Sequence, residues 1–112
     1  MSYKFDKDKL ITCGIENTLP HSVTLLLWQL VGAHVWLSET EGKTVDYLQV
    51  FDLSTNTATK MLTVKHKQEQ PDYKKTHTYR IESEEVLKEL NGLKIFVIDD
   101  ITHSTMLLAE EY

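Results

Sequence analysis

The C-terminal stretch from Leu93 to Tyr112 constrains the fold of this chain more than any other part of the sequence. It holds two apolar runs, Leu93–Ile98 and Thr105–Ala109, on either side of the polar segment Asp99–Ser104. Short runs rich in β-branched and aromatic residues around a polar loop are typical of paired strands. In the first run both alternating sets of side chains are apolar. We therefore expect a central strand with both of its faces covered.

An apolar stripe further upstream predicts the main helix. Pro20 suits the first helical position, where no intrahelical N–H bond is needed. The side chains that recur at the spacing of a core-facing helix are Val23, Leu26, Leu27 and Leu30. Gly32 is expected to end this helix, and the polar segment 38–44 is expected to form a mobile loop.

Two more strands and a short helix are expected, besides the hairpin at residues 60–80 described below. The strands are Lys9–Thr12 and Val45–Leu53. The helix begins at Ser83 as its N-cap, directs Leu87 and Leu90 inward, and ends before Gly92. The pattern predicts an α+β fold: a mostly antiparallel sheet of five or six strands, with one main helix packed on one face and a short second helix.

Composition places the chain among ordinary soluble domains. Its 112 residues, 41% hydrophobic and 26% charged, predict a single domain over residues 1–112 that needs no metal or disulfide to hold its core. Cys13 is the sole cysteine, which fits a reducing compartment. We find neither a signal peptide nor an apolar run of membrane-spanning length in the sequence. A cytoplasmic location is the resulting expectation.

Residues 60–80 form the most informative local pattern, a hairpin. With Pro71-Asp72 at the turn, His66 faces His77, one side is apolar near its base, and the other side is polar and cationic. A one-residue slip would break both patterns, which favours this register. A slightly longer loop with the same centre would serve equally well.

The hairpin also concentrates positive charge in an acidic protein. Residues 60–80 carry six basic and two acidic residues, a net charge of +4, whereas the whole chain has a net charge of −5. The polar side of the hairpin is a candidate surface for a phosphate backbone or for a partner protein, with Tyr73 placed to stack on a base. Its alternative role is a solvated face that prevents strand pairing. The candidate contacts are Lys65, Lys67, Tyr73, Lys74 and Arg80.

Two other groups of residues could bind a metal or take part in catalysis. His66 and His77, with His103 or Asp99 as a third ligand, are one candidate metal site, although histidine pairs of this kind are usually structural. The segment Asp99–Ser104 holds acid, imidazole and hydroxyl groups, but neighbours in sequence rarely form a catalytic triad. The sequence contains no glycine-rich phosphate loop, nucleophile elbow or metalloprotease helix motif. We therefore predict no metal, no cofactor and no enzymatic activity.

The acidic remainder of the chain is a candidate surface for a basic partner protein, or simply a source of solubility. The chain ends in Glu110, Glu111 and Tyr112, which we take as candidate partner contacts, since a disordered tail has no need of a terminal tyrosine. A tyrosine docked on the domain itself is equally compatible with the sequence.

Several segments together resemble the domain-of-unknown-function 960 family of small bacterial proteins, chiefly from Firmicutes. They are Ile11–Ile15, Leu27–Leu30, Asp46–Phe51, His66–Lys74 and Ile98–Tyr112. The family often has arginine in place of Cys13 and a shorter segment around Ser83–Leu90, which argues against a role for Cys13 and makes the second helix dispensable. The family has no assigned activity. Similar members occur in phage-like and staphylococcal cassette elements, so the resemblance implies an accessory protein of a mobile element.

The resulting hypothesis is a non-enzymatic accessory or regulatory protein of a bacterial mobile element that binds a host or mobile-element protein. The alternative is a nucleic-acid-binding module that uses the cationic side of the 60–80 hairpin. We expect no membrane association.

Overall fold

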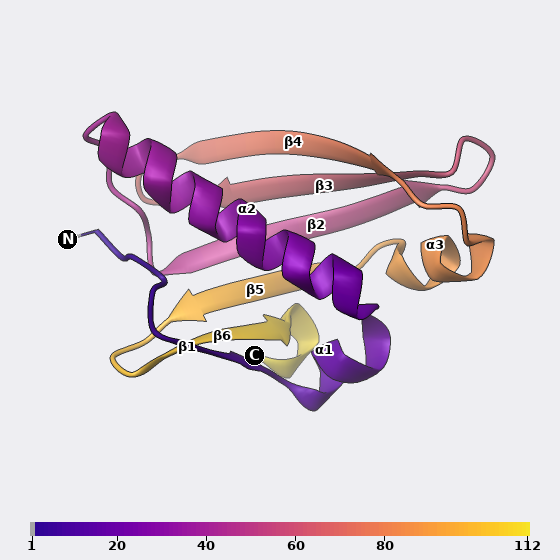
Figure 1. Cartoon of the computed structure of the whole chain (residues 1–112), viewed down its shortest axis with the longest axis horizontal. Coiled ribbons are helices and arrows are strands. Elements are labelled where there is room, and N and C mark those ends of the chain that lie inside the picture. Colours follow the sequence, from indigo (N-terminus) through magenta and orange to yellow (C-terminus); the bar gives the residue numbers. More distant parts are fainter. Residues whose placement is uncertain (1) are drawn as a thin grey trace.

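The computed structural model describes residues 2–112 as a six-stranded sheet with its main helix on one face (Figure 1). The strand order is β1-β6-β5-β2-β3-β4. β1 runs parallel to β6, and every other neighbouring pair is antiparallel. This confirms the predicted α+β class and the mostly antiparallel sheet. The strands are β1 (Asp8–Ile11), β2 (Leu48–Asn56), β3 (Met61–Gln68), β4 (Tyr73–Arg80), β5 (Lys94–Asp99) and β6 (His103–Leu108).

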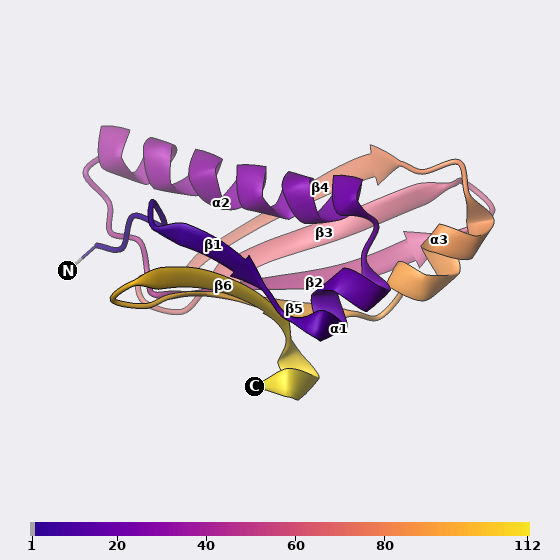
Figure 2. The ribbon, with the colours of Figure 1, turned by 60° about the horizontal axis from the view of Figure 1, so that its bottom comes forward.

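The main helix, α2 (His21–Thr40), lies across one face of the sheet as a separate layer (Figure 2). The core lies between these two layers. From α2 it takes Leu27 and Val31, and from the sheet it takes residues that alternate along the strands, since successive side chains of a strand point to opposite faces. The fully buried members from the sheet include Phe51, Leu62, Val64, Ile95, Val97 and Met106. None of the helices in the described part of the chain is long and apolar enough to span a bilayer.

The prediction that α2 ends at Gly32 is wrong, because the helix continues to Thr40 and takes in the first part of the expected 38–44 loop. Val31, Val35 and Ser38 are buried in turn along the helix, so burial continues at helical spacing past the glycine. A glycine inside a helix costs only about 0.5–1 kcal/mol relative to alanine, which this burial outweighs.

Other elements also differ from the expectation. β2 runs from Leu48 to Asn56, three positions later at each end than expected. Its start moves because Val45 is buried beside the N-terminal segment and its carbonyl accepts a hydrogen bond from the Tyr3 N–H at 2.9 Å. A short helix, α1 (Cys13–Thr18), follows β1 and was not expected from the sequence. Thr12 caps this helix by accepting from the Ile15 N–H. The third helix, α3 (Glu84–Leu90), has the predicted Ser83 N-cap and the predicted buried Leu87 and Leu90.

The hairpin of β3 and β4 forms, but its register is two residues away from the prediction. His77 faces Val64 and His66 faces Lys75, so the two histidines are not opposed. A shift of two leaves every side chain on its predicted face, which is why the apolar and cationic patterns of the sequence did not detect it. The loop centre moves because Gln68 pairs with Tyr73, which leaves residues 69–72 as the loop.

Candidate binding face of the sheet

Apart from a short 3-10 helix at its edge, η1 (Ala109–Glu111), the face of the sheet turned away from α2 has no helix against it in the described residues (Figure 2). We call this surface the open face. Its side chains are the ones that alternate with the buried core positions on β2 to β6, and most of them are half-buried or exposed. The predicted double-sided cover of β5 is therefore wrong: Ile95 and Val97 are buried, but Phe96 and Ile98 lie half-buried on the open face. Neighbouring strands and the C-terminal residue give these two only partial cover.

One half of the open face is apolar. Leu48 pairs with Ile98, and Val50 pairs with Phe96, across the β2–β5 ladder. The ring of Tyr112 meets that of Phe96 edge-on, with 5.4 Å between ring centroids, yet 73% of Tyr112 remains exposed. A half-buried apolar surface topped by an exposed aromatic ring is well suited to contact another molecule.

The other half of the open face is cationic. Lys67 and Lys74 are direct cross-strand partners, an unfavourable pairing of like charges, and Lys65 lies on the same face opposite Thr76. Asp52 offsets part of this charge, because its carboxylate lies 2.8 Å from the Lys67 ammonium and 3.8 Å from that of Lys94. Two adjoining hollows of about 430 and 510 Å³ lie over these lysines, the first of them extending over the apolar half.

The structure brings together three of the five hairpin residues selected from the sequence, Lys65, Lys67 and Lys74. Arg80 lies at the far end of β4, where its guanidinium donates to Glu82 at 2.7 Å, and this hydrogen bond raises the arginine pKa. Tyr73 lies on the opposite side of the sheet and stacks on His34 at 4.0 Å between ring centroids. Burial there raises the pKa of its hydroxyl.

The three C-terminal candidates have different surroundings. Glu111 folds back onto the start of α1, where its Oε1 accepts from the Thr12 hydroxyl at 2.6 Å and from the Leu108 N–H at 2.9 Å. These bonds lower the pKa of the Glu111 carboxyl. Glu110 is exposed, whereas Tyr112 belongs to the open face. Sequence reasoning missed this contact. Gly14 leaves room for it, since a Cβ there would lie 2.5 Å from the Glu111 carboxylate.

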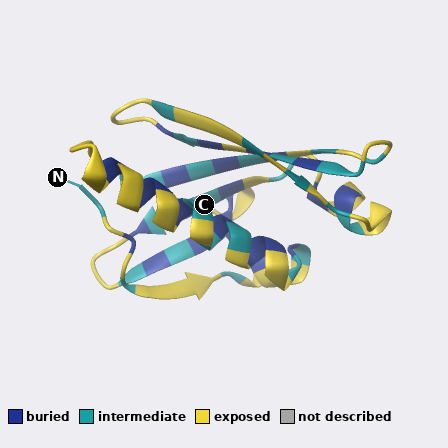
Figure 3. Cartoon of the chain, turned by 45° about the horizontal axis from the view of Figure 1, so that its top comes forward, coloured by how far each residue is buried: buried dark blue, intermediate teal, exposed yellow. Residues whose placement is uncertain are grey.

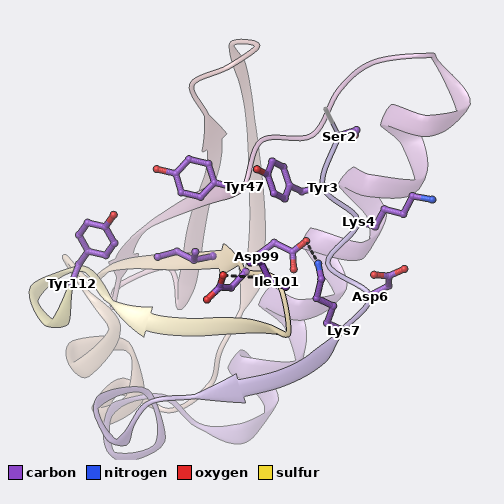
Figure 4. A pocket seen from close by; sticks show the side chains of 11 residues that line it. Ser2, Tyr3, Lys4, Asp6, Lys7, Tyr47, Asp99, Ile101 and Tyr112 are labelled. Atoms are coloured by element: carbon purple, nitrogen blue, oxygen red, sulfur yellow. Dashed lines mark hydrogen bonds and ion pairs between the residues drawn. The ribbon is translucent and has the colours of Figure 1, made fainter.

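An open pocket of about 830 Å³ continues the open face toward the N-terminal segment (Figure 4). Tyr3 and Tyr47 stand side by side on one of its walls, with their ring centroids 6.0 Å apart, and Ile98 and Tyr112 connect it to the apolar half. The predominantly apolar lining has one buried carboxylate, Asp99, at its border. Pockets of this kind accept an apolar or aromatic group.

Asp99 anchors the N-terminal segment and is not arranged for catalysis. Its carboxylate accepts from the Phe5 N–H at 3.2 Å, the Lys7 ammonium at 2.9 Å and the Ser104 hydroxyl at 2.7 Å. His103 lies next to the Thr102 hydroxyl, at 2.7 Å, and makes no hydrogen bond with Ser104. Because the buried Ser104 hydroxyl donates to the carboxylate, this segment lacks the serine–imidazole pair that activates a nucleophile.

The buried histidines belong to a polar cluster beneath α2. His66 Nε2 donates to Gln49 Oε1 at 2.7 Å, and His34 Nε2 donates to Gln68 Oε1 at 2.9 Å. Burial, together with the neighbouring positive charge, lowers the pKa of His66 to about 3. Within residues 2–112 no group of three potential metal ligands comes together.

The fold and this face define a class: a small α+β domain whose mixed sheet is covered by a helix on one side and open on the other. The family model described as "Staphylococcal protein of unknown function (DUF960)" matches residues 8–111, so the chain belongs to this family. A crystal structure of a protein of unknown function from Enterococcus faecalis has the same fold, with a TM-score of 0.78 at 22% identity. The match covers 100% of this chain and 98% of the other. No curated protein matches the chain.

Proposed function

We propose that this chain is a non-enzymatic binding protein that receives an apolar and acidic segment of a partner protein on its open face. One observation carries the proposal: a single uncovered sheet surface joins an apolar half, centred on Phe96, to a cationic half, centred on Lys67 and Lys74. The resemblance to proteins of mobile elements makes a host or mobile-element protein the expected source of the segment.

The chemistry of the two halves favours a peptide over a nucleic acid. The apolar half is mainly aliphatic, with Leu48, Val50 and Ile98 around one strand-borne ring. Aliphatic side chains pack well against aliphatic side chains, whereas bases are bound by stacking on aromatic rings. Lys65 and Lys74 have no carboxylate partner among residues 2–112 and are therefore available to acidic side chains.

The arrangement of Ser104 and His103 supports a non-enzymatic role. A general base must reach the proton that it removes. The Ser104 hydroxyl is buried and already donates to Asp99, and His103 hydrogen-bonds Thr102 instead. The open pocket beside this segment has the character of a docking site for one side chain of the partner.

A random peptide library displayed on phage tests the proposal. We expect panning against the immobilised chain to enrich peptides that combine Asp or Glu with Leu, Ile or Phe. The Lys65→Glu/Lys74→Glu variant should bind such a peptide at least about tenfold more weakly, a loss of about 1.4 kcal/mol, in fluorescence anisotropy. Val50→Glu should weaken binding similarly.

Lys9→Glu/Lys88→Glu is the matched control, because it makes the same charge change at exposed positions outside the open face. It should bind the peptide as the unmodified chain does. Failure to enrich any peptide, or enriched peptides whose affinity is unchanged by the open-face substitutions, would exclude this function.

A second candidate function, binding of single-stranded nucleic acid, is favoured by the lysines and by the hydroxyls of Thr63, Thr76 and Thr78 on the same face. Against it, Lys67 and Arg80 are paired with carboxylates, Tyr73 faces the other way, and the chain carries a net charge of −5. Titration with fluorescent oligo(dT) and oligo(U) distinguishes the two. Salt-sensitive binding that is lost when Lys65, Lys67, Lys74 and Arg80 are replaced by Gln would favour nucleic acid.

A further inference from the structure

A second uncovered surface lies on the opposite side of the molecule, along the outer side of α2 (Figure 3). No described element packs over this side of the helix (Figure 2). We call it the outer face of α2, and its members are Leu25, Gln29, Gly32, Ala33, Trp36 and Leu37, all of them exposed. From His21 to Ser38 the helix contains no Asp, Glu, Lys or Arg.

Such a surface is unusual for a helix that faces water. A solvent-facing helix normally carries charged residues opposite its apolar stripe, and a helix that is apolar all round is normally buried. Trp36 is 66% exposed, Leu25 48% and Leu37 38%. Large apolar side chains gathered on one uncovered side mark a contact surface.

We propose that the outer faces of α2 from two copies of this chain pack against each other in an antiparallel, two-fold dimer. The order of side-chain sizes makes the face complementary to itself. Bulky Leu25 stands near one end, bulky Trp36 and Leu37 stand near the other, and Gly32 and Ala33 lie between them with Gln29. When two α2 helices pack antiparallel and cross at Gly32 and Ala33, Leu25 of each copy contacts Trp36 and Leu37 of the other.

The small residues determine how closely the two helices approach. A Cβ added at Gly32 would meet nothing within 4 Å inside one copy, so the space above this glycine is empty. Gly and Ala at a helix crossing allow close contact between backbones. In the antiparallel arrangement the Gln29 side chain of one copy lies over Gly32 and Ala33 of the other.

Charge favours the antiparallel orientation. Each chain carries a net charge of −5, which opposes the association of two copies, so their contact surface must lack acidic groups, as the helix does from His21 to Ser38. The first charged residues near this face are Glu39 and Glu41, at the C-terminal end of the helix. Antiparallel packing brings them toward the His21 end of the other copy, whereas parallel packing would oppose like charges.

The size of the contact predicts its strength. A helix of 20 residues is about 30 Å long. A contact one helix wide over that length lies at the low end of specific interfaces. We expect a dimer that dissociates at micromolar concentration.

Sedimentation equilibrium of the full chain over a range of concentrations tests the proposal. The mass should rise from 13.0 kDa toward twice that value as the concentration increases. Trp36→Glu and Gly32→Arg should each weaken self-association at least tenfold. Since Gly32 has open space above it and arginine is the better helix former, Gly32→Arg should keep or raise the Tm of the monomer. Asn17→Arg, an equal charge change at an exposed position of α1, should leave association unchanged.

Cross-linking tests the orientation. In a Cys13→Ser background, a mixture of the Ser22→Cys and Thr40→Cys variants should be joined by a short bismaleimide, while Ser22→Cys alone should not.

A mass of 13.0 kDa at every concentration overturns the proposal, as does a dimer that survives both Trp36→Glu and Gly32→Arg. Efficient linking of Ser22→Cys to itself overturns the antiparallel arrangement. The chain could also stay monomeric while the Trp36→Glu variant no longer binds the peptides enriched from the library. That result would assign the outer face of α2 to a different protein and would also overturn self-association.

Discussion

His66, a candidate metal ligand in the sequence, is a buried and hydrogen-bonded core residue in the structure. Its ring stacks on Phe51 at 4.4 Å between centroids, donates to Gln49 and is 1% exposed. Alternation along the hairpin predicts that His66 shares a face with Leu62 and Val64, and the structure confirms this, since all three are buried. This alternation gave no sign of His34 and Gln49 as neighbours, because these come from α2 and β2, and the contacts depend on how the layers pack.

The pKa of His66 predicts a loss of stability in acid. The unfolded chain protonates this ring near pH 6.5, whereas the folded chain protonates it near 3. Between pH 3 and pH 6.5 the unfolded chain therefore binds a proton at His66 that the folded chain does not bind. The free energy of unfolding should fall by up to about 1.4 kcal/mol per pH unit from His66 as the pH drops through this window.

Urea unfolding at a series of pH values measures this slope. His66→Gln retains a donor for Gln49 and should reduce the slope. His34 and His77, whose pKa values burial also lowers, should contribute to the slope that remains. His21→Gln, at an exposed position, should keep the original slope. An identical slope in His66→Gln and the unmodified chain would contradict the assignment.

At the level of elements, the sequence predicted the types of structure better than their limits and neighbours. Local periodicity found α2, α3 and the hairpin, because side chains of one period share a face. It misplaced the end of α2, since the cost of Gly32 is offset by burial farther along. It misplaced the β3–β4 register by two, since both registers present the same faces. Contacts between distant segments, such as Glu111 with α1, could not be predicted from local periodicity. The glycine at position 14 is required by this contact, but its role becomes visible only in the structure.

Gly14 and Glu111 are expected to be energetically coupled. Ordinarily Gly→Ala in a helix stabilises by about 0.5–1 kcal/mol. Here the added methyl group displaces the Glu111 carboxylate from Thr12 and Leu108, which offsets that gain. Gly14→Ala should therefore leave the free energy of unfolding nearly unchanged in the original chain.

The same substitution in a Glu111→Ala background should recover the usual gain, because the obstructing carboxylate is gone. A double-mutant cycle measured by chemical denaturation gives the coupling directly. Equal effects of Gly14→Ala in both backgrounds would show that the two residues act independently.

On the scale of the whole molecule, the two proposed contact surfaces lie on opposite sides of the sheet. α2 covers one side, and the open face occupies the other (Figure 2). Of these surfaces, the sequence indicated the cationic half of the open face. The outer face of α2 was not recognised, since Gly32 was taken as the end of the helix and Trp36 was left outside it.

This separation predicts that the surfaces act independently. A saturating library peptide on the open face should leave the dimer intact and give a complex of two chains with two peptides in sedimentation velocity. The dissociation constant of the dimer should not change with peptide. Dissociation on peptide addition would show that the peptide binds α2 or that the two sides of the sheet are linked.

The pairing of β1 with β6 has a consequence for how the chain is made. Within this domain β1 is synthesised before the other strands, yet its Asp8 pairs in the sheet with His103 of β6, which is synthesised after them. β1 therefore has no neighbouring strand until β6 has been made, and the sheet beneath α2 is incomplete until then. A nascent chain stalled before β6 emerges should expose its core-facing side chains to chaperones, because the pairing of β6 completes the sheet.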